Sequence, residues 1–269
     1  MMLNEINKIS YFIKRDLCEH LYVSLYHSDR SQTKLVYKND TKNKIYNNQI
    51  DFNFFEILPS LTYSLLLRNK ALLYFDIKSD AQNNKEISFH AIRTKYSIKR
   101  KGIIVNDIKI PQKDLCKYII IKLSKEIKSK KIKKSFDTLA KINTMATNDV
   151  SLIQSIPVDI KGYEEQINLF ALKETKELGG LIGYDQERLN LTGYYAYVRE
   201  LKKQILQYEL FFNIIDEINK HFIKFSKEID MDIELSTDKC QYNELKETLS
   251  KMKDHKIDLL KVSDILYKR

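Results

Sequence analysis

Residues 71–110, ALLYFDIKSDAQNNKEISFHAIRTKYSIKRKGIIVNDIKI, decide the fold class of this chain. They contain short runs of β-branched and aromatic residues, separated by polar residues, at 71–77, 87–92, 94–98 and 103–110. Runs of this length and composition are typical of strands. The stretch therefore predicts a small antiparallel sheet, which Pro111 closes before the next helix begins.

Apolar residues at helical spacing flank this sheet in the sequence on both sides. Helices are predicted at 3–26, 52–69, 112–131, 163–178, 194–225, 240–253 and 261–267, and one further strand at 229–235. Pro59 either bends the second of these helices or begins its second half. The longest, 194–225, carries two apolar rows, which is typical of a helix sandwiched between neighbours. The predicted class is α+β and mainly helical, a small antiparallel sheet with long helices.

The order of these elements divides the chain into four expected segments. They are an N-terminal helix and loop (1–50), a helix plus small sheet (51–111), a basic helix and turn region (112–160), and a long-helix core with C-terminal strand and helices (161–269).

Composition bounds the class of protein. An apolar content of 43%, with 17 Tyr and 12 Phe, indicates a folded chain rather than a disordered one. Three widely separated cysteines give no disulfide framework, and we expect a reducing compartment. No stretch reaches the roughly 18 apolar residues of a membrane span. We therefore expect a soluble protein without a membrane span, made inside a cell.

Positive charge is concentrated between Arg93 and Lys134, where 15 Lys and Arg stand against three acidic residues. The segment net of +12 exceeds the +10 of the whole chain, so the remaining residues sum to −2. Such a field attracts polyanions. The predicted helix 112–131 would carry a lysine stripe that faces nucleic acid or another partner: Lys113, Lys117, Lys128 and Lys131. The alternative is a solvated helix face in a lysine-rich chain.

Asp76 and Lys78 end the apolar run LLYFDIK with the acid-x-lysine spacing of restriction-type nuclease sites. In such sites a strand presents a metal-binding carboxylate and a lysine at one edge, next to the phosphate that is cleaved. The alternative, a strand leaving the core, is the more common origin of this pattern.

Other residue patterns give weaker signals for chemistry. Asp230, Asp232 and Glu234 alternate along a predicted strand, where they could hold a divalent ion or form the solvent face of an edge strand. His90 and His221 lie within apolar patterns and are predicted to be core or interface residues. No phosphate-binding loop, dinucleotide fingerprint, nucleophile elbow or zinc-ligand spacing is present. We therefore expect no enzyme activity, no cofactor and no metal.

Several phrases resemble the core of the tailed-bacteriophage portal, or head–tail connector, family. SLTYSLLLRNKALLYFDI (60–77) is similar to a family helix that ends in "SLLLxGNAY" and runs into a strand, although Arg68-Asn69-Lys70 stands where the family often has Gly-Asn. ISFHAIRTKYSIKR (87–100) and IIVNDIKI (103–110) resemble the hairpins that follow. Residues 178–222 resemble the channel loop and its long helix, and 229–269 resemble the strand and short helices that close such cores.

The resemblance implies a structural protein of the virion. Portal proteins form rings, commonly of twelve subunits, at one capsid vertex, and double-stranded DNA passes through the ring during packaging and ejection. The partners would be other copies of this chain, the terminase packaging motor, and capsid and tail or adaptor proteins. The chain would be made in the bacterial cytoplasm, and its basic segment would lie near the stem of the ring.

Two other functions remain open at this point. The first is a non-ring nucleic-acid-binding or interaction protein of a mobile element. The second is a metal-dependent nuclease that uses Asp76 and Lys78.

Overall fold

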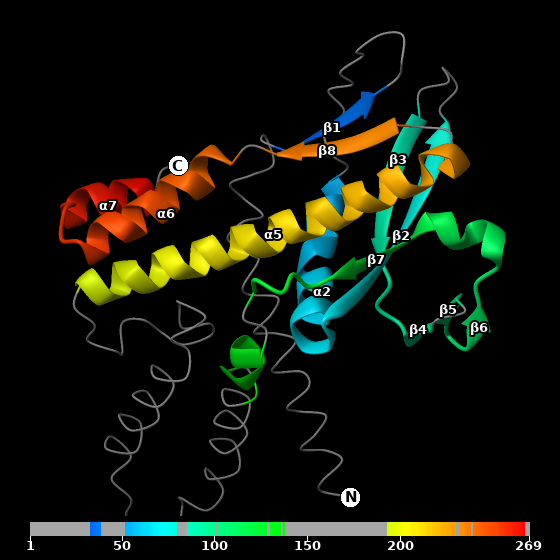
Figure 1. Ribbon diagram of the computed structural model, residues 1–269, viewed down its shortest axis with the longest axis horizontal. Helices are drawn as coiled ribbons and strands as arrows, with labels where there is room; N and C mark the ends of the chain where they lie inside the picture. Colours follow the sequence, from blue (N-terminus) through cyan, green and yellow to red (C-terminus); the bar gives the residue numbers. More distant parts are fainter. Residues whose placement is uncertain are drawn as a thin grey trace, which may run out of the picture. The chain divides into compact units, whose positions relative to one another are not determined.

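The computed structural model describes residues 33–38, 52–79, 85–99, 102–127, 130–135, 137, 193–229, 232–237 and 239–266. Their elements are helices and small antiparallel sheets, in agreement with the α+β class (Figure 1). The predicted helices at 3–26 and 163–178 lie outside these residues. The chain divides into two compact units, one drawn from residues 22–124 and 209–238, the other from 1–21, 125–208 and 239–269. The expected boundaries at residues 50, 111 and 160 stay predictions.

Helix α2 (Phe52–Arg68) confirms the predicted helix at 52–69 and continues through Pro59. Its Leu58, Leu61, Leu65 and Leu66 are almost completely buried. The helix ends at Asn69, whose φ of 59° is left-handed and whose N–H donates to the Leu65 carbonyl at 2.8 Å. Asn tolerates this conformation better than other non-glycine residues, so it turns the chain directly into the next strand.

Strand β2 (Lys70–Ser79) is the centre of a three-stranded antiparallel sheet in the order β3-β2-β7, and α2 packs against β2 and β3. The outer strands are β3 (Lys85–Ala91) and β7 (Tyr118–Lys122). Register places Phe75 opposite Phe89 and Leu73 opposite Ile119. All four side chains are buried, so this sheet supplies the core of its unit.

A second three-stranded sheet, the basic sheet, is formed by β4 (Tyr96–Lys99), β5 (Gly102–Val105) and β6 (Ile108–Lys109). Asn106 and Asp107, with φ of 50° and 64°, make the tight turn between β5 and β6. Two consecutive left-handed residues match the twist of a two-residue hairpin. The single predicted sheet over 71–110 is therefore two separate sheets.

The predicted helix over 112–131 is wrong. Residues Gln112–Lys117 form only a short 3-10 helix, η1, and the chain then enters strand β7. Within the Tyr118–Lys122 strand, Ile119 and Ile121 are buried while Lys122 is exposed. A run of three isoleucines favours a strand because branching at Cβ restricts helical side-chain rotamers. Hydrogen-bonded pairing with β2 stabilises this strand further.

Helix α5 (Gly193–Ile229) confirms the long predicted helix, and its backbone leaves helical geometry at Phe225, where φ is −112° and ψ is 18°. The unit boundary falls between Tyr208 and Glu209. Beyond that boundary, Phe222 contacts Phe75 and Phe89 with ring centroids 5.2 and 6.3 Å away, so α5 covers the face of the β3-β2-β7 sheet that carries these rings.

Strand β8 (Asp232–Thr237) confirms the predicted strand near 229–235 and pairs antiparallel with β1 (Thr33–Lys38). Strand β1 lies in the segment expected to hold an N-terminal helix and a loop. The two strands lie side by side in Figure 1. Helix α6 (Cys240–Lys253) and helix α7 (Leu259–Leu266) confirm the last two predicted helices.

Helix α6 runs antiparallel to the first part of α5. Tyr194, at the start of α5, donates to the carbonyl of Met252, at the end of α6, at 3.3 Å. Tyr208, one end of this part of α5, lies 6.1 Å from the Tyr242 ring near the start of α6. Gly193 lies beside Leu259 of α7, so both short helices adjoin this part of α5.

Candidate functional site

The four predicted lysines do not form a stripe on one helix. Lys113 and Lys117 lie on η1 and are exposed. Lys131 lies in the helical residues 130–135 of the other unit, and Lys128 lies outside the described residues. The loss of the helix removes the geometric reason to group them. Contact of each lysine with nucleic acid or a partner stays a prediction.

Asp76 and Lys78 both lie on β2, where Asp76 is half-buried and stands opposite Ser88, and Lys78 stands opposite Glu86. A metal-dependent nuclease site needs further carboxylates close to the first. Within the described ranges, no three His, Cys, Asp or Glu side chains gather closely enough to hold a metal ion. The nuclease stays a prediction that this geometry does not strengthen.

Of the three alternating acidic residues at 230, 232 and 234, the structure describes the last two, which lie on β8. Asp232 pairs in register with Lys38, and Glu234 is half-buried opposite Val36, while Asp230 lies outside the described residues. Within the described residues, β8 and β1 form a two-stranded sheet, so β8 is an edge strand, as one of the two alternatives suggested. Glu234 is half-buried on this strand rather than fully exposed to solvent.

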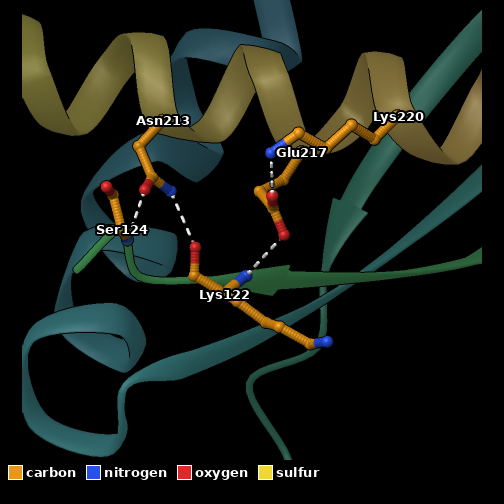
Figure 2. A network of polar contacts seen from close by, with 5 residues as sticks. All are labelled: Lys122, Ser124, Asn213, Glu217 and Lys220. Carbon is orange, nitrogen blue, oxygen red and sulfur yellow. Dashed lines mark hydrogen bonds and ion pairs between the residues drawn. The ribbon is translucent and has the colours of Figure 1, made fainter.

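The best-defined polar network of the unit that contains both three-stranded sheets joins α5 to the edge strand β7 (Figure 2). Asn213 Nδ2 donates to the Lys122 carbonyl at 2.9 Å, and its Oδ1 accepts from the Ser124 N–H at 2.6 Å. Glu217 Oε2 accepts from the Lys122 N–H at 3.3 Å, and its Oε1 binds Lys220 at 2.6 Å. These side chains occupy backbone groups that an edge strand otherwise offers to another chain.

His221 continues the same helix face, one turn after Glu217. Its Nε2 lies 2.6 Å from the Cys116 carbonyl of η1. Because a carbonyl only accepts, Nε2 carries the proton and donates it. Burial lowers the pKa of His221, the Cys116 bond opposes that shift, and the Lys224 charge adds to it. The imidazole is thus a structural donor, and the predicted core or interface role fits it; His90, by contrast, is exposed.

Asn219 makes two hydrogen bonds to the backbone of strand β8, as Asn213 does near β7. Its Nδ2 donates to the Leu235 carbonyl at 2.9 Å, and its Oδ1 accepts from the Leu235 N–H at 2.8 Å. A side-chain amide that bonds both the N–H and the C=O of a strand residue imitates the peptide of a neighbouring strand. Helix α5 therefore fixes two strands, β7 and β8, through Asn213 and Asn219.

Electrostatics in this network favour the charged pair. A hydrogen bond to Glu217 raises the pKa of Lys220, with further support from the charges of Glu217 and Asp216. Since Lys220 is largely exposed, the pair itself contributes little to stability. The bonds from Asn213 and Glu217 to the backbone matter more, because they satisfy groups at a covered strand edge.

Sequence reasoning missed this network, although a signal for it existed. Asn213 interrupts two apolar rows of the long helix and is buried to 8% exposure. A polar residue within a helix face that is otherwise buried needs a hydrogen-bond partner, which the sequence could not name.

Comparisons with known proteins identify no relative: no family model matches this chain, and neither does any curated protein or solved structure. No helix of the described part of the chain is long and apolar enough to cross a membrane.

Proposed function

We propose that this chain is a subunit of a portal-like ring, a non-enzymatic virion protein through which double-stranded DNA passes. The subunit would sit at a capsid vertex and would dock the packaging motor and, later, tail proteins. Three observations support the proposal: the order of the elements, one backbone conformation and a set of exposed apolar side chains.

The observation that carries the proposal is the order of elements along the chain. The resemblance implies a helix that runs into strands and hairpins, and later a long helix followed by a strand and short helices. The described elements follow this order: α2 leads directly into β2, and α5 is succeeded by β8, α6 and α7.

The departure of this sequence from the family phrase has a physical explanation. Asn69 stands where that phrase has glycine, and its φ of 59° is the left-handed conformation that glycine adopts most easily. Asn is the common substitute at such a helix end. The position therefore serves the same turn from helix to strand with a different residue.

A ring also requires a surface for the neighbouring subunit. Both apolar rows of α5 are already buried within one chain, so the wide apolar arc does not itself require a neighbour. The large apolar side chains that are exposed in the described residues are Ile108, Tyr195, Ile223, Leu259 and Leu260. Ring formation by heterologous contacts would cover some of these.

Mass measurement and electron microscopy of the purified chain at several salt concentrations test the proposal. We expect closed rings, and we expect the double variant Ile223→Glu with Leu260→Glu to shift them toward monomer, since a charge would be buried at the contact. The matched control is Lys224→Gln with Lys261→Gln, which makes the same change in net charge at neighbouring exposed positions. A wild-type chain that stays monomeric at every salt concentration would contradict the ring.

The basic sheet favours a second candidate, a nucleic-acid-binding protein that forms no ring. DNA binding by a strictly monomeric chain would support it. Cleavage of DNA with Mg²⁺ that Asp76→Ala abolishes would instead establish the nuclease.

A further inference from the structure

The basic sheet has two chemically different faces. Strand alternation and register place Tyr96, Ile98, Ile103, Val105 and Ile108 on one face. Ile103 is buried to 4% exposure, and the Tyr96 hydroxyl donates to the Lys70 carbonyl at 3.1 Å. This apolar face is therefore turned toward the rest of its unit at Tyr96 and Ile103, whereas Ile108 on β6 stays exposed.

The opposite face, which we call the lysine face, is formed by Ser97, Lys99, Gly102, Ile104 and Lys109. Lys99 and Lys109 are exposed. Gly102 lies between them: it pairs with Lys99, and a Cβ at this position would lie 3.7 Å from the Lys109 Cε. Its φ of 144° disfavours a side chain. The stem of Lys109 therefore lies over a position without a side chain, on the same face as Lys99.

Acidic residues compensate little of this charge. Between residues 93 and 122 the sequence has nine Lys and Arg against Asp107 and Asp114. Asp107 binds Lys95 at 3.1 Å, and both side chains are 79% exposed. Among the described residues, no carboxylate pairs with Lys99 or Lys109.

Further positive charge lies on an element of the same unit that contacts the basic sheet. Helix η1 contacts β5 and carries the exposed Lys113 and Lys117. In the sequence, Arg100 and Lys101 make up the whole connection between β4 and β5. These cations thus belong to one small sheet and the 3-10 helix that follows it, rather than to the single helix predicted over residues 112–131.

We propose that the lysine face, together with Lys113 and Lys117, binds the phosphate backbone of double-stranded DNA. The inference rests on the proposed function, because it names the surface with which a DNA-conducting subunit would meet its cargo. Lysine is a point charge that follows phosphates without reading base edges. Binding is therefore independent of sequence and weakens steeply with salt.

The composition of this surface favours nucleic acid over an acidic protein or a lipid surface. Stable protein interfaces have an apolar, often aromatic centre, and membrane-surface binding needs inserted apolar side chains. The lysine face offers only Ile104, which is half-buried. Its partner must therefore be recognised by charge alone, and regularly spaced phosphates supply that charge.

The test measures binding of the full chain to a short fluorescent DNA duplex across a salt series. Replacement of Lys99, Lys109, Lys113 and Lys117 by Gln should flatten the slope of log affinity against log salt, by about 0.9 for each phosphate that the variant no longer neutralises. The matched control replaces Lys224, Lys227, Lys253 and Lys261 by Gln, with the same change in net charge at other exposed positions. The control should retain most of the wild-type slope.

Three results would overturn the inference: an unchanged slope in the first variant, an equal reduction of the slope in both variants, or wild-type binding to polyglutamate or anionic vesicles but not to the duplex. Circular dichroism and thermal melting confirm that each variant is folded. Ring assembly of the same samples, followed by mass measurement, is an independent readout. Rings with an unchanged slope reject only the lysine face, whereas a flattened slope without rings rejects only the ring.

Discussion

The two three-stranded sheets of one unit have opposite relations to solvent. In the β3-β2-β7 sheet, the facing pairs Phe75–Phe89 and Leu73–Ile119 are buried, and α5 closes the β7 edge with side-chain hydrogen bonds. In the basic sheet, one face is apolar and the other carries exposed lysines. The same strand geometry therefore supplies a core in one case and an exposed basic surface in the other. The difference is that α5 covers a face of the β3-β2-β7 sheet, whereas the lysines on the lysine face of the basic sheet are exposed to solvent.

The largest effect is expected where α5 enters the core of the first sheet. Phe222 is 1% exposed and contacts Phe75 and Phe89. Phe222→Ala should lower the free energy of unfolding by about 3–5 kcal/mol, because it removes buried surface and leaves a cavity. Chemical denaturation measures the decrease.

The neighbouring substitution Ile223→Ala is the control, since Ile223 is 75% exposed. Its cost should stay within about 0.5 kcal/mol. Equal costs for the two variants would show that α5 does not cover this sheet as described.

The next effect concerns the covered edge of β7. Asn213→Ala leaves the Ser124 N–H and the Lys122 C=O without their partner and should cost about 2–3 kcal/mol. Hydrogen exchange at the Ser124 amide should accelerate, because its hydrogen bond is removed. Asp216→Ala, at an exposed position on the same helix, should change neither quantity.

Asn213→Asp separates the two bonds. It retains an acceptor for Ser124 but removes the donor to Lys122, so protection of the Ser124 amide should survive better than in Asn213→Ala. An equally fast exchange in both variants would mean that Asn213 Oδ1 does not protect this amide.

A smaller effect, dependent on pH, should come from His221. Burial lowers its pKa in the folded state, so the unfolded state binds a proton more readily. The contribution of neutral His221 to the free energy of unfolding is complete above the usual histidine pKa of about 6.5. It declines as the pH falls toward the lowered pKa of the folded state. Denaturation at neutral and mildly acidic pH should therefore show a decrease in stability that His221→Gln reduces.

The exposed His90 provides the control for the substitution itself. His90→Gln removes a histidine side chain without removing the contact with the Cys116 carbonyl. If His221→Gln leaves the pH dependence of unfolding unchanged, His221 is not the group that couples acid to unfolding.

The smallest effect on stability is expected on the lysine face. Lys99→Gln and Lys109→Gln should each change the free energy of unfolding by less than about 0.5 kcal/mol, because these side chains are exposed. Denaturation curves that coincide with the wild type would confirm it. A large decrease would mean that these lysines support the fold, and would make their use as a DNA contact surface harder to separate from folding.

The failures of sequence reasoning share a cause. The run at Ile119-Ile120-Ile121 lies beside lysines at helical spacing, and a short apolar run fits a helix or a buried strand equally well. Pairing of β7 with β2 made it a strand, with Leu73 opposite Ile119. Likewise, the strands over 71–110 were recognisable from composition, but their division into two sheets depended on which strands paired.

The sequence by itself determined the long helix α5, the helix α2, the two C-terminal helices and the presence of short strands, because periodicity and residue type act locally. It also determined that positive charge gathers between residues 93 and 134. Only the tertiary structure decided that this charge is divided among a small sheet, a 3-10 helix, an edge strand and the helical residues 130–135 of the other unit. It also decided that Asn213 and Asn219 each bond a strand. Strand pairing and buried hydrogen bonds join residues far apart in the chain, so local preferences cannot specify them.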